Sequence, residues 1–212
     1  MKRFRFTLTA ICLVLLWLGW TDTSLFLRNR TPETITAAEL VKNGPPREWL
    51  HISGGYQDLL MGISMSGNIE LDSFLIPLRV SPESGQPIEI LVETRDPLVL
   101  QRLKDYYFKF DTEQGKQAYL KEHQADFFGP RDITGMVVGG LIATGNKDKL
   151  MKLAKDEGLD VSDKVLFISE GKEPSSVRGF IFLALGLLGL FKVLARWKKI
   201  DNTPSSLTDG EP

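Results

Sequence analysis

The sequence predicts an α+β protein in which a small, mostly antiparallel sheet domain lies between two transmembrane helices. Apolar residues gather at both ends of the chain, although the chain as a whole is only 42% hydrophobic and 25% charged. Between the ends, segments typical of strands outnumber segments typical of helices. The middle segment, residues 31–177, contains 23 acidic and 16 basic residues and so carries a net charge of −7. Nucleic-acid binders usually carry a basic patch, and this acidic segment argues against that class of partner.

The N-terminal run is predicted to be a membrane anchor over residues 1–27. An uncharged stretch runs from Phe6 to Thr21, and the segment from Phe6 to about Leu25 reaches the length of a span if Asp22 lies at the headgroups. Three basic residues precede it: Lys2, Arg3 and Arg5. A cleaved signal peptide has the same plan and is the alternative, but no A-x-A cleavage pattern follows the run. Trp17 and Trp20 instead fit the aromatic belt of a membrane interface.

The C-terminal run, residues 177–199, is predicted to be a second transmembrane helix. Its uncharged part, Gly179–Phe191, is short, and it reaches the length of a span only if Lys192 extends its ammonium to the interface. A helix packed on the domain is the alternative, although this run has no polar face. The predicted membrane-interface anchors of the two runs are Trp17, Trp20, Lys192, Arg196, Trp197, Lys198 and Lys199.

The orientation of the two helices follows from the basic residues close to them. Seven lie on the side of the termini, against four near the ends of the central segment: Arg28, Arg30, Lys172 and Arg178. We therefore expect both termini in the cytoplasm, residues 31–175 outside it, and residues 200–212 as a disordered cytoplasmic tail. The membrane expected is a bacterial inner membrane.

The first half of the central domain reads as one short helix followed by strands. Thr36 and Glu39 have the spacing of a capping box, which predicts a helix to about Lys42, ending before Gly44. Four strands are then predicted, each from its apolar pattern and the turn residues around it. They are 49–53, 59–66, 69–80 and 88–94, with Pro77 marking a bulge or an edge position in the third.

The second half alternates helices and strands. Asp96 as N-cap and Pro97 at the first position predict a helix with an apolar face. That face contains Val99, Leu103, Tyr106, Tyr107 and Phe110. Further elements are predicted as a helix at 113–123, a strand at 132–142, a helix at 146–157 that stops at Gly158, and a strand at 164–169. A helix between the third and fourth strands is also compatible with an OB-like barrel.

One segment, Gly140–Asp148, has the context of a phosphate-binding loop but not its motif. A P-loop requires Gly-Lys-Ser/Thr at its end, so that the lysine and the hydroxyl reach phosphate and Mg²⁺. Here Asn146 separates Gly145 from Lys147, and Asp148 stands where the hydroxyl is needed. We expect no bound nucleotide, and the glycines are explained by a strand-turn-helix connection.

The residues that could bind metal are few and scattered. His51 and His123 have no spacing that pairs them. Met61, Met65 and Met136 could offer thioether ligands to Cu(I), but packing in the core is the simpler explanation. The single cysteine, Cys12, lies in the first apolar run, so a disulfide framework is excluded. No cofactor or metal is expected.

Catalytic signatures are also missing from the sequence. It contains no G-x-S-x-G elbow and no Ser-His or Cys-His pattern. Glu89 and Glu93 share one face of a predicted strand, which is typical of a solvated face rather than of an acid/base pair. The Asn29-Arg30-Thr31 triplet matches an N-glycosylation acceptor, but it is followed by Pro32 and lies close to the membrane.

These observations favour a non-catalytic, two-pass membrane protein. We expect its extracytoplasmic domain to serve protein–protein interaction or the assembly of a membrane complex, with the lipid bilayer and other membrane proteins as partners and no nucleic acid. The alternatives are an accessory subunit of a transporter or channel complex, and a membrane-anchored hydrolase. Two spans without an acid or base deep in the membrane do not form a transport pathway by themselves.

Overall fold

The computed structural model describes the whole chain except residues 1, 66–72, 83–84, 86, 139–142 and 202–212. For residues 2–5, 143–147 and 196–201 the backbone alone is described. The predicted disordered tail lies almost wholly outside this part of the chain. The chain divides into two compact units, one made of Met1–Arg28 with Pro174–Pro212, the other of Asn29–Glu173.

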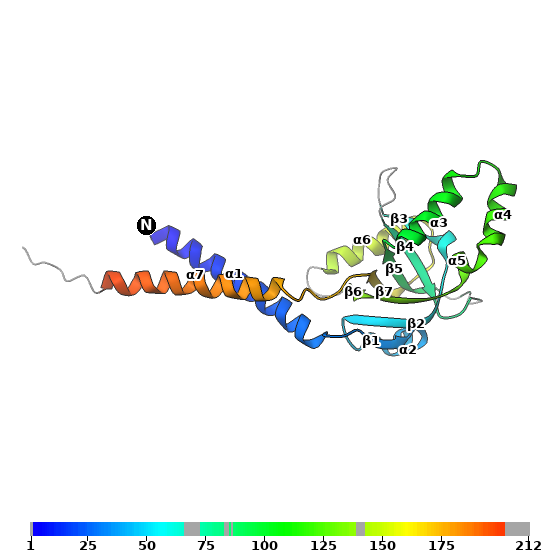
Figure 1. Cartoon of the computed structure of the whole chain (residues 1–212). Coiled ribbons are helices and arrows are strands. Elements are labelled where there is room, and N and C mark those ends of the chain that lie inside the picture. Colours follow the sequence, from blue (N-terminus) through cyan, green and yellow to red (C-terminus); the bar gives the residue numbers. More distant parts are fainter. Residues whose placement is uncertain (1, 66–72, 83–84, 86, 139–142, 202–212) are drawn as a thin grey trace, which may run out of the picture. The chain divides into compact units, whose positions relative to one another are not determined.

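The first unit is a pair of long helices, α1 (Lys2–Arg28) and α7 (Arg178–Asp201), which pack against each other (Figure 1). The contacts run in opposite chain directions, since Gly19 lies against Leu183 while Gly186 lies against Leu16. Small residues form the contact: a Cβ on Gly19 would come within 2.6 Å of the Leu183 backbone nitrogen. The two helices can therefore approach closely only because glycine occupies these positions.

The outer surface of this helix pair is apolar. Large apolar side chains of both helices are exposed, among them Trp17 (57%), Trp20 (67%), Leu188 (66%) and Phe191 (73%). Both helices are long and apolar enough to cross a membrane, over Phe6–Arg28 and Arg178–Ala195. Only 17% of either apolar window is buried, so neither is a core helix of the unit to which it belongs.

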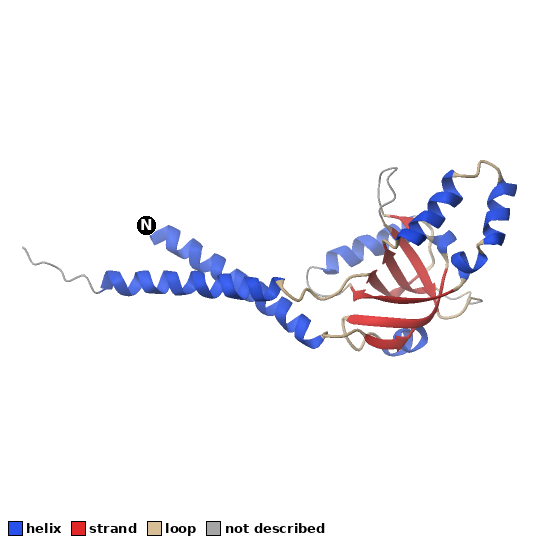
Figure 2. Cartoon of the chain, in the orientation of Figure 1, coloured by secondary structure: helices blue, strands red, loops and turns tan. Residues whose placement is uncertain are grey.

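The second unit is an α+β domain built on a closed barrel (Figure 2). Among the described residues, five strands close the barrel in the order β2-β6-β7-β5-β4 and back to β2. These strands are β2 (Trp49–Gln57), β4 (Phe74–Arg79), β5 (Ile88–Thr94), β6 (Pro130–Val137) and β7 (Val161–Glu170). Neighbouring barrel strands are antiparallel except β5 and β7, so the sheet is mixed. The short strands β1 (Glu33–Thr36) and β3 (Ile63–Ser64) extend the sheet beyond β2 and β4.

Helices cover the barrel on several sides. They are α2 (Ala37–Asn43), the 3-10 helix η1 (Leu59–Met61), α3 (Pro97–Phe108), α4 (Glu113–Glu122), α5 (Gln124–Phe128) and α6 (Ala143–Asp156). The consecutive helices α3, α4 and α5 lie between β5 and β6, the third and fourth strands of the barrel in chain order. A helical insertion was predicted at this point, although as two helices rather than three.

Strand alternation divides the apolar residues of the domain into separate clusters. Ile90, Val92 and Ile168 belong to the barrel interior, which α2 covers with Ala37 and Leu40. The residues between them, such as Leu91 and Phe167, face the other way and pack against Ala154 of α6. A third cluster joins α3, α4 and α5 to β4 and η1, with Leu103 and Phe127 fully buried.

Several predicted elements are confirmed closely. The strand at 88–94 is β5 with the same bounds. The capping box at Thr36 and Glu39 is formed, and Gly44 follows the helix with φ of +76°. The Asp96 carboxylate caps α3 by accepting from the Leu98 amide at 2.8 Å, and Gly158 stops α6 with φ of +82°.

Other boundaries were wrong for local reasons. The strand predicted at 49–53 continues to Gln57, because Gly54 adopts φ of +68° and forms an irregularity that lets pairing with β6 resume at Gly55. The strand predicted at 59–66 is instead η1 followed by the two residues of β3, because the Asp58 carboxylate accepts from the Met61 amide and turns the chain. The first part of the strand predicted at 69–80 lies outside the described residues, and β4 begins at Phe74.

Three further predictions need correction. The segment at 33–36, for which no strand was predicted, is β1 and pairs in parallel with β2. The strand predicted at 132–142 is β6, which starts earlier at Pro130 and ends at Val137; residues 139–142 are outside the described part. On α3, Tyr107 is 43% exposed, and the apolar face continues through Tyr106, which packs on Phe127.

Candidate functional site

A polar cleft lies where several barrel strands end together. It has a volume of about 480 Å³. Its lining comes from the end of β5, the start of α3 and the end of β7, with the residues that follow β7. The lining residues are Glu93, Arg95, Asp96, Ser169, Glu170, Gly171 and Lys172.

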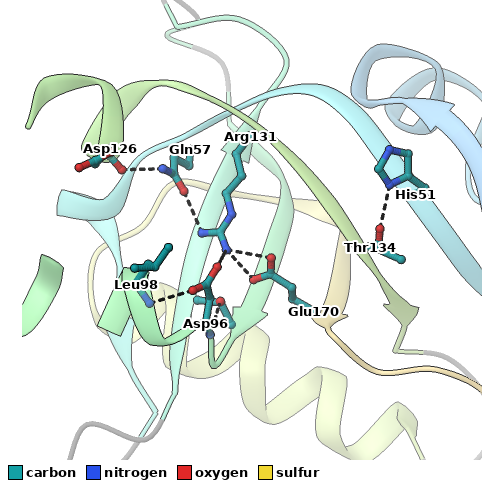
Figure 3. A network of polar contacts seen from close by, with 9 residues as sticks. His51, Gln57, Asp96, Leu98, Asp126, Arg131, Thr134 and Glu170 are labelled. Carbon is teal, nitrogen blue, oxygen red and sulfur yellow. Dashed lines mark hydrogen bonds and ion pairs between the residues drawn. The ribbon is translucent and has the colours of Figure 1, made fainter. Parts of the chain in front are cut away.

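Arg131 holds this end of the barrel together (Figure 3). Its Nη2 donates to Asp96 at 2.9 Å and to both carboxylate oxygens of Glu170 at 2.8 and 3.0 Å. Its Nη1 donates to Gln57 Oε1 at 3.0 Å. One guanidinium therefore ties the ends of β2, β7 and the β5–α3 connection to β6. The Arg131 side chain is only 13% exposed, which strengthens these charge-assisted bonds.

The carboxylates of the cleft floor are less exposed than its cations. The side chains of Glu93 and Glu170 are 15% and 16% exposed, and that of Asp96 is 34% exposed. Arg95 and Lys172 are 69% and 62% exposed and stand at the rim. The cleft is thus a polar surface with acidic groups inside and solvated cations outside.

Ser169 is the one hydroxyl in the lining, and it sits in a hydrogen-bond chain. Its Oγ donates to Glu93 Oε2 at 2.8 Å and lies 3.3 Å from Lys172 Nζ, which donates to it. Ser169 and Glu93 are direct partners in the β5–β7 pairing. A nucleophilic serine needs a base that removes its proton, and here the Glu93 carboxylate is the acceptor. That carboxylate is also held by ion pairs, with Arg95 at 3.2 Å and with Lys172 at 3.9 Å. This geometry favours a cross-strand structural bond over an activated nucleophile.

A smaller groove of about 200 Å³ adjoins the cleft at Asp96. Its walls combine Leu98, which is 76% exposed, with the Arg102–Asp126 ion pair at 2.8 Å. A hydrogen bond with Tyr119 raises the pKa of Arg102, and the charge of Asp126 raises it further against the opposing effect of burial. The groove therefore presents an exposed aliphatic side chain beside a permanent cation.

The two histidines are far from forming one site. His51 Nδ1 lies 2.8 Å from Thr134 Oγ1, which connects β2 to β6 (Figure 3). His123 joins α4 to α5 and stacks on Tyr119, with ring centroids 4.3 Å apart. Among the residues that the structure describes, no group of three or more His, Cys, Asp or Glu could hold a metal ion.

The other sequence candidates have structural roles. Met61 and Met65 pack against the cluster under α6, and the Met61 sulfur lies 3.3 Å from Arg79 Nη2. Gly145 lies within α6 rather than in a loop, while residues 139–142 are outside the described part. Asn29 is fully buried and donates to Glu48 Oε2 at 2.9 Å, so this sequon is closed to glycosylation in the folded domain.

The predicted interface anchors belong to the helix unit. Trp17 and Trp20 are exposed on α1, and Lys192 is exposed on α7. Arg196, Trp197, Lys198 and Lys199 lie in the last turns of α7, where the backbone alone is described.

Sequence reasoning missed the Arg131 hydrogen-bond network beside the cleft. Arg131, Glu170 and Gln57 stand at strand ends far apart in the chain, and only barrel closure brings them together. Two cleft residues were named from the sequence for roles in the domain. Asp96 was recognised as a helix cap but not as a partner of Arg131, and Glu93 was expected on a solvated face, although its side chain is only 15% exposed.

Comparison of the chain with family models, with curated proteins and with solved structures finds no match.

Proposed function

We propose that this chain is a two-pass membrane protein that displays residues 31–175 outside the cytoplasm. The observation that carries the proposal is the distribution of side chains on the α1–α7 pair. Glycine and other small residues fill the contact between the helices, while bulky apolar side chains face outward. In water this arrangement would expose a large apolar surface, whereas in a bilayer the lipid chains cover it.

The opposite directions of α1 and α7 support termini on the same side of the membrane. The basic residues flanking the helices favour the cytoplasm for that side. Trp17, Trp20 and Lys192 are exposed and so are free to act as interface anchors, as proposed also for Arg196, Trp197, Lys198 and Lys199. A bacterial inner membrane is the setting that we propose.

For the domain we propose a non-catalytic role in contacts with other membrane proteins, in the assembly of a membrane complex or as an accessory subunit of one. The barrel order, with helices between its third and fourth strands, supports an OB-like fold. In that fold, nucleic acids bind on the face of the second and third strands. Here Leu75 and Leu91 on those strands are fully buried in the cluster that includes Ala154 of α6, which argues against nucleic acid as a partner.

The topology is tested by cysteine labelling with a membrane-impermeant maleimide. Asp163→Cys, at a side chain that is 92% exposed, should label in intact cells or spheroplasts. Ser205→Cys should label only after lysis, and the native Cys12, which is 2% exposed, should stay silent. Labelling of both introduced cysteines from outside would mean that one helix alone spans. Amino-terminal sequencing of the purified protein tests whether the first run is a cleaved signal, in which case the chain would start near residue 25.

The interaction role is tested by photo-crosslinking in intact membranes. A photoreactive residue replaces Leu98, in the groove beside the cleft, and in a matched variant it replaces Glu113, whose side chain is 81% exposed on α4. Crosslinks to another integral membrane protein from position 98 but not from 113 support the proposal. A chain that crosslinks from neither position, and migrates alone after mild solubilisation, contradicts it.

The hydrolase alternative rests on Ser169 in the cleft. The Ser169→Ala variant should keep every function of the chain, because we assign the hydroxyl a structural bond to Glu93. A loss of function in that variant with an unchanged melting temperature would favour the hydrolase.

A further inference from the structure

An ion pair joins one end of the α1–α7 pair. Arg178 Nε donates to Asp22 Oδ2 at 2.6 Å, and Arg178 Nη2 donates to Asp22 Oδ1 at 3.0 Å. This two-point geometry fixes the relative position of a carboxylate and a guanidinium more strictly than a single bond does. The Asp22 side chain is 18% exposed and that of Arg178 is 62% exposed, so the pair sits at the surface of the helix contact.

The contact between the helices continues from this pair towards the chain termini. Gly179 lies against Thr23, Gly186 against Leu16, and Gly189 against Cys12. Val193, one helical turn further, is 5% exposed. The two helices therefore keep one register along the contact. Charged residues on either helix bound the same apolar region of the pair, which we call the slab.

That slab is short. The uncharged run of α1, Phe6–Thr21, has 16 residues and a length of about 24 Å at 1.5 Å per residue. The uncharged run of α7, Gly179–Phe191, has 13 residues and a length of about 20 Å. If Lys192 extends its ammonium outward, the α7 run continues to Ala195 and reaches about 26 Å. A typical hydrocarbon core is about 30 Å thick, so the slab falls short by about 4–10 Å.

The residues around Asp22 argue that this position is a boundary and not the interior of the slab. Trp20, two residues before it, is 67% exposed, as suits an aromatic belt. The neighbours of Asp22 in the sequence, Thr21, Thr23 and Ser24, are polar. Moving the ion pair into hydrocarbon would add the cost of removing two charges from water.

We propose that the α1–α7 pair is built for a bilayer with a thin hydrocarbon core, with Asp22 and Arg178 marking one of its boundaries. This inference rests on the proposed membrane function. A helix pair shorter than the core must thin the bilayer or draw charged groups inward, and each ångström of mismatch has a cost. The chain therefore prefers thin membranes, or thins the membrane around itself.

The test is reconstitution of the full chain into phosphatidylcholine vesicles whose monounsaturated acyl chains have fourteen, eighteen or twenty-two carbons. The readout is the fraction of protein that floats with the vesicles after alkaline extraction. We expect extraction-resistant protein to be greatest in the fourteen-carbon lipid and at least about tenfold lower in the twenty-two-carbon lipid. Equal insertion in all three lipids, or a maximum in the eighteen-carbon lipid, overturns the inference.

Two variants show whether the ion pair sets the boundary. The charge swap Asp22→Arg with Arg178→Asp keeps a pair in place and should keep the preference for the thinnest lipid. The double variant Asp22→Leu with Arg178→Leu extends the uncharged run of α1 to Leu27, which is 22 residues or about 33 Å. For this variant, the extraction-resistant fraction of protein should be greatest in a thicker lipid. If it is still greatest in the fourteen-carbon lipid, the ion pair does not set the boundary.

Failure of the membrane proposal itself would look different. In that case, the chain would not float with vesicles of any thickness after extraction, and the three lipids would not differ. An inserted chain without a thickness preference would leave the proposed function standing and remove only this inference.

Discussion

The Arg131 guanidinium donates to both carboxylate oxygens of Glu170, at 2.8 and 3.0 Å, and the same nitrogen donates to Asp96 at 2.9 Å. Arg131 lies at the start of β6 and Glu170 at the end of β7. The pairing of these two strands is short, with register partners from Gly135–Glu170 to Val137–Ile168. The side-chain bonds therefore join the two strands near a point where few backbone bonds do.

Replacement of Arg131 by Met should destabilise the domain by about 2–3 kcal/mol, because it leaves two partly buried carboxylates without their cation. The matched control is Arg102→Met, which breaks an ion pair whose two side chains are 36% and 48% exposed and should cost about 0–1 kcal/mol. Urea unfolding of both variants, followed by circular dichroism, measures the difference. Equal effects would show that the Arg131 bonds are no stronger than a surface pair.

The helix α3 gives a second prediction, this time about packing. Leu103 is fully buried in the cluster that joins α3, α4 and α5, so Leu103→Ala should cost about 2–5 kcal/mol. Gln101, two residues earlier, is exposed and bonds only weakly to Asp105 at 3.5 Å. Gln101→Ala should leave the melting temperature nearly unchanged. A neutral Leu103→Ala together with a damaging Gln101→Ala would mean that the buried face is assigned to the wrong residues.

Local signals in the sequence were enough to predict the elements that depend on neighbouring residues. Caps at Thr36 and Asp96 and the stop at Gly158 act within one helical turn, so the residues that form them are close in sequence. The strand β5 is apolar over Ile90–Val92 because its two faces pack against different clusters. These features were therefore predicted with nearly correct bounds.

Features that depend on distant residues were not predicted. The extension of β2 past Gly54 requires Arg131 and Pro130 as pairing partners, which lie more than seventy residues away. The Arg131 network beside the polar cleft requires barrel closure before Gln57, Arg131 and Glu170 can meet. The segment 59–66 has the apolar composition of a strand, but its first three residues, Leu59–Met61, form a 3-10 helix in which the Met61 amide donates to the Asp58 carboxylate.

The capping box of α2 predicts a local dependence on pH. Hydrogen bonds from the side chain and the backbone of Thr36 lower the pKa of Glu39 below its ordinary value of 4.5. A carboxyl group whose pKa is lower in the folded state stabilises that state above its unfolded pKa and loses this contribution as the pH falls. Amide exchange in α2 should therefore speed up as the pH falls below about 4.5, after correction for the intrinsic rate. In Glu39→Gln this extra acceleration should vanish. Thr36→Ala should weaken the helix by about 1 kcal/mol and also reduce the acceleration, because it removes the largest cause of the lowered Glu39 pKa.

The contact between Gly189 and Cys12 predicts a disulfide that can be engineered with one substitution. A Cβ on Gly189 would lie 3.9 Å from the Cys12 Cβ, inside the range of about 3.5–4.5 Å found in disulfides. Gly189→Cys should therefore crosslink α1 to α7 when the membranes are treated with a mild oxidant. After proteolytic cleavage of the domain, the two helices should stay together on a non-reducing gel and separate with reductant. Leu188→Cys, at a side chain that is 66% exposed, is the matched control and should not crosslink within the chain. If position 188 crosslinks and position 189 does not, α7 presents a different face to α1, and the register from Asp22 to Val193 is wrong.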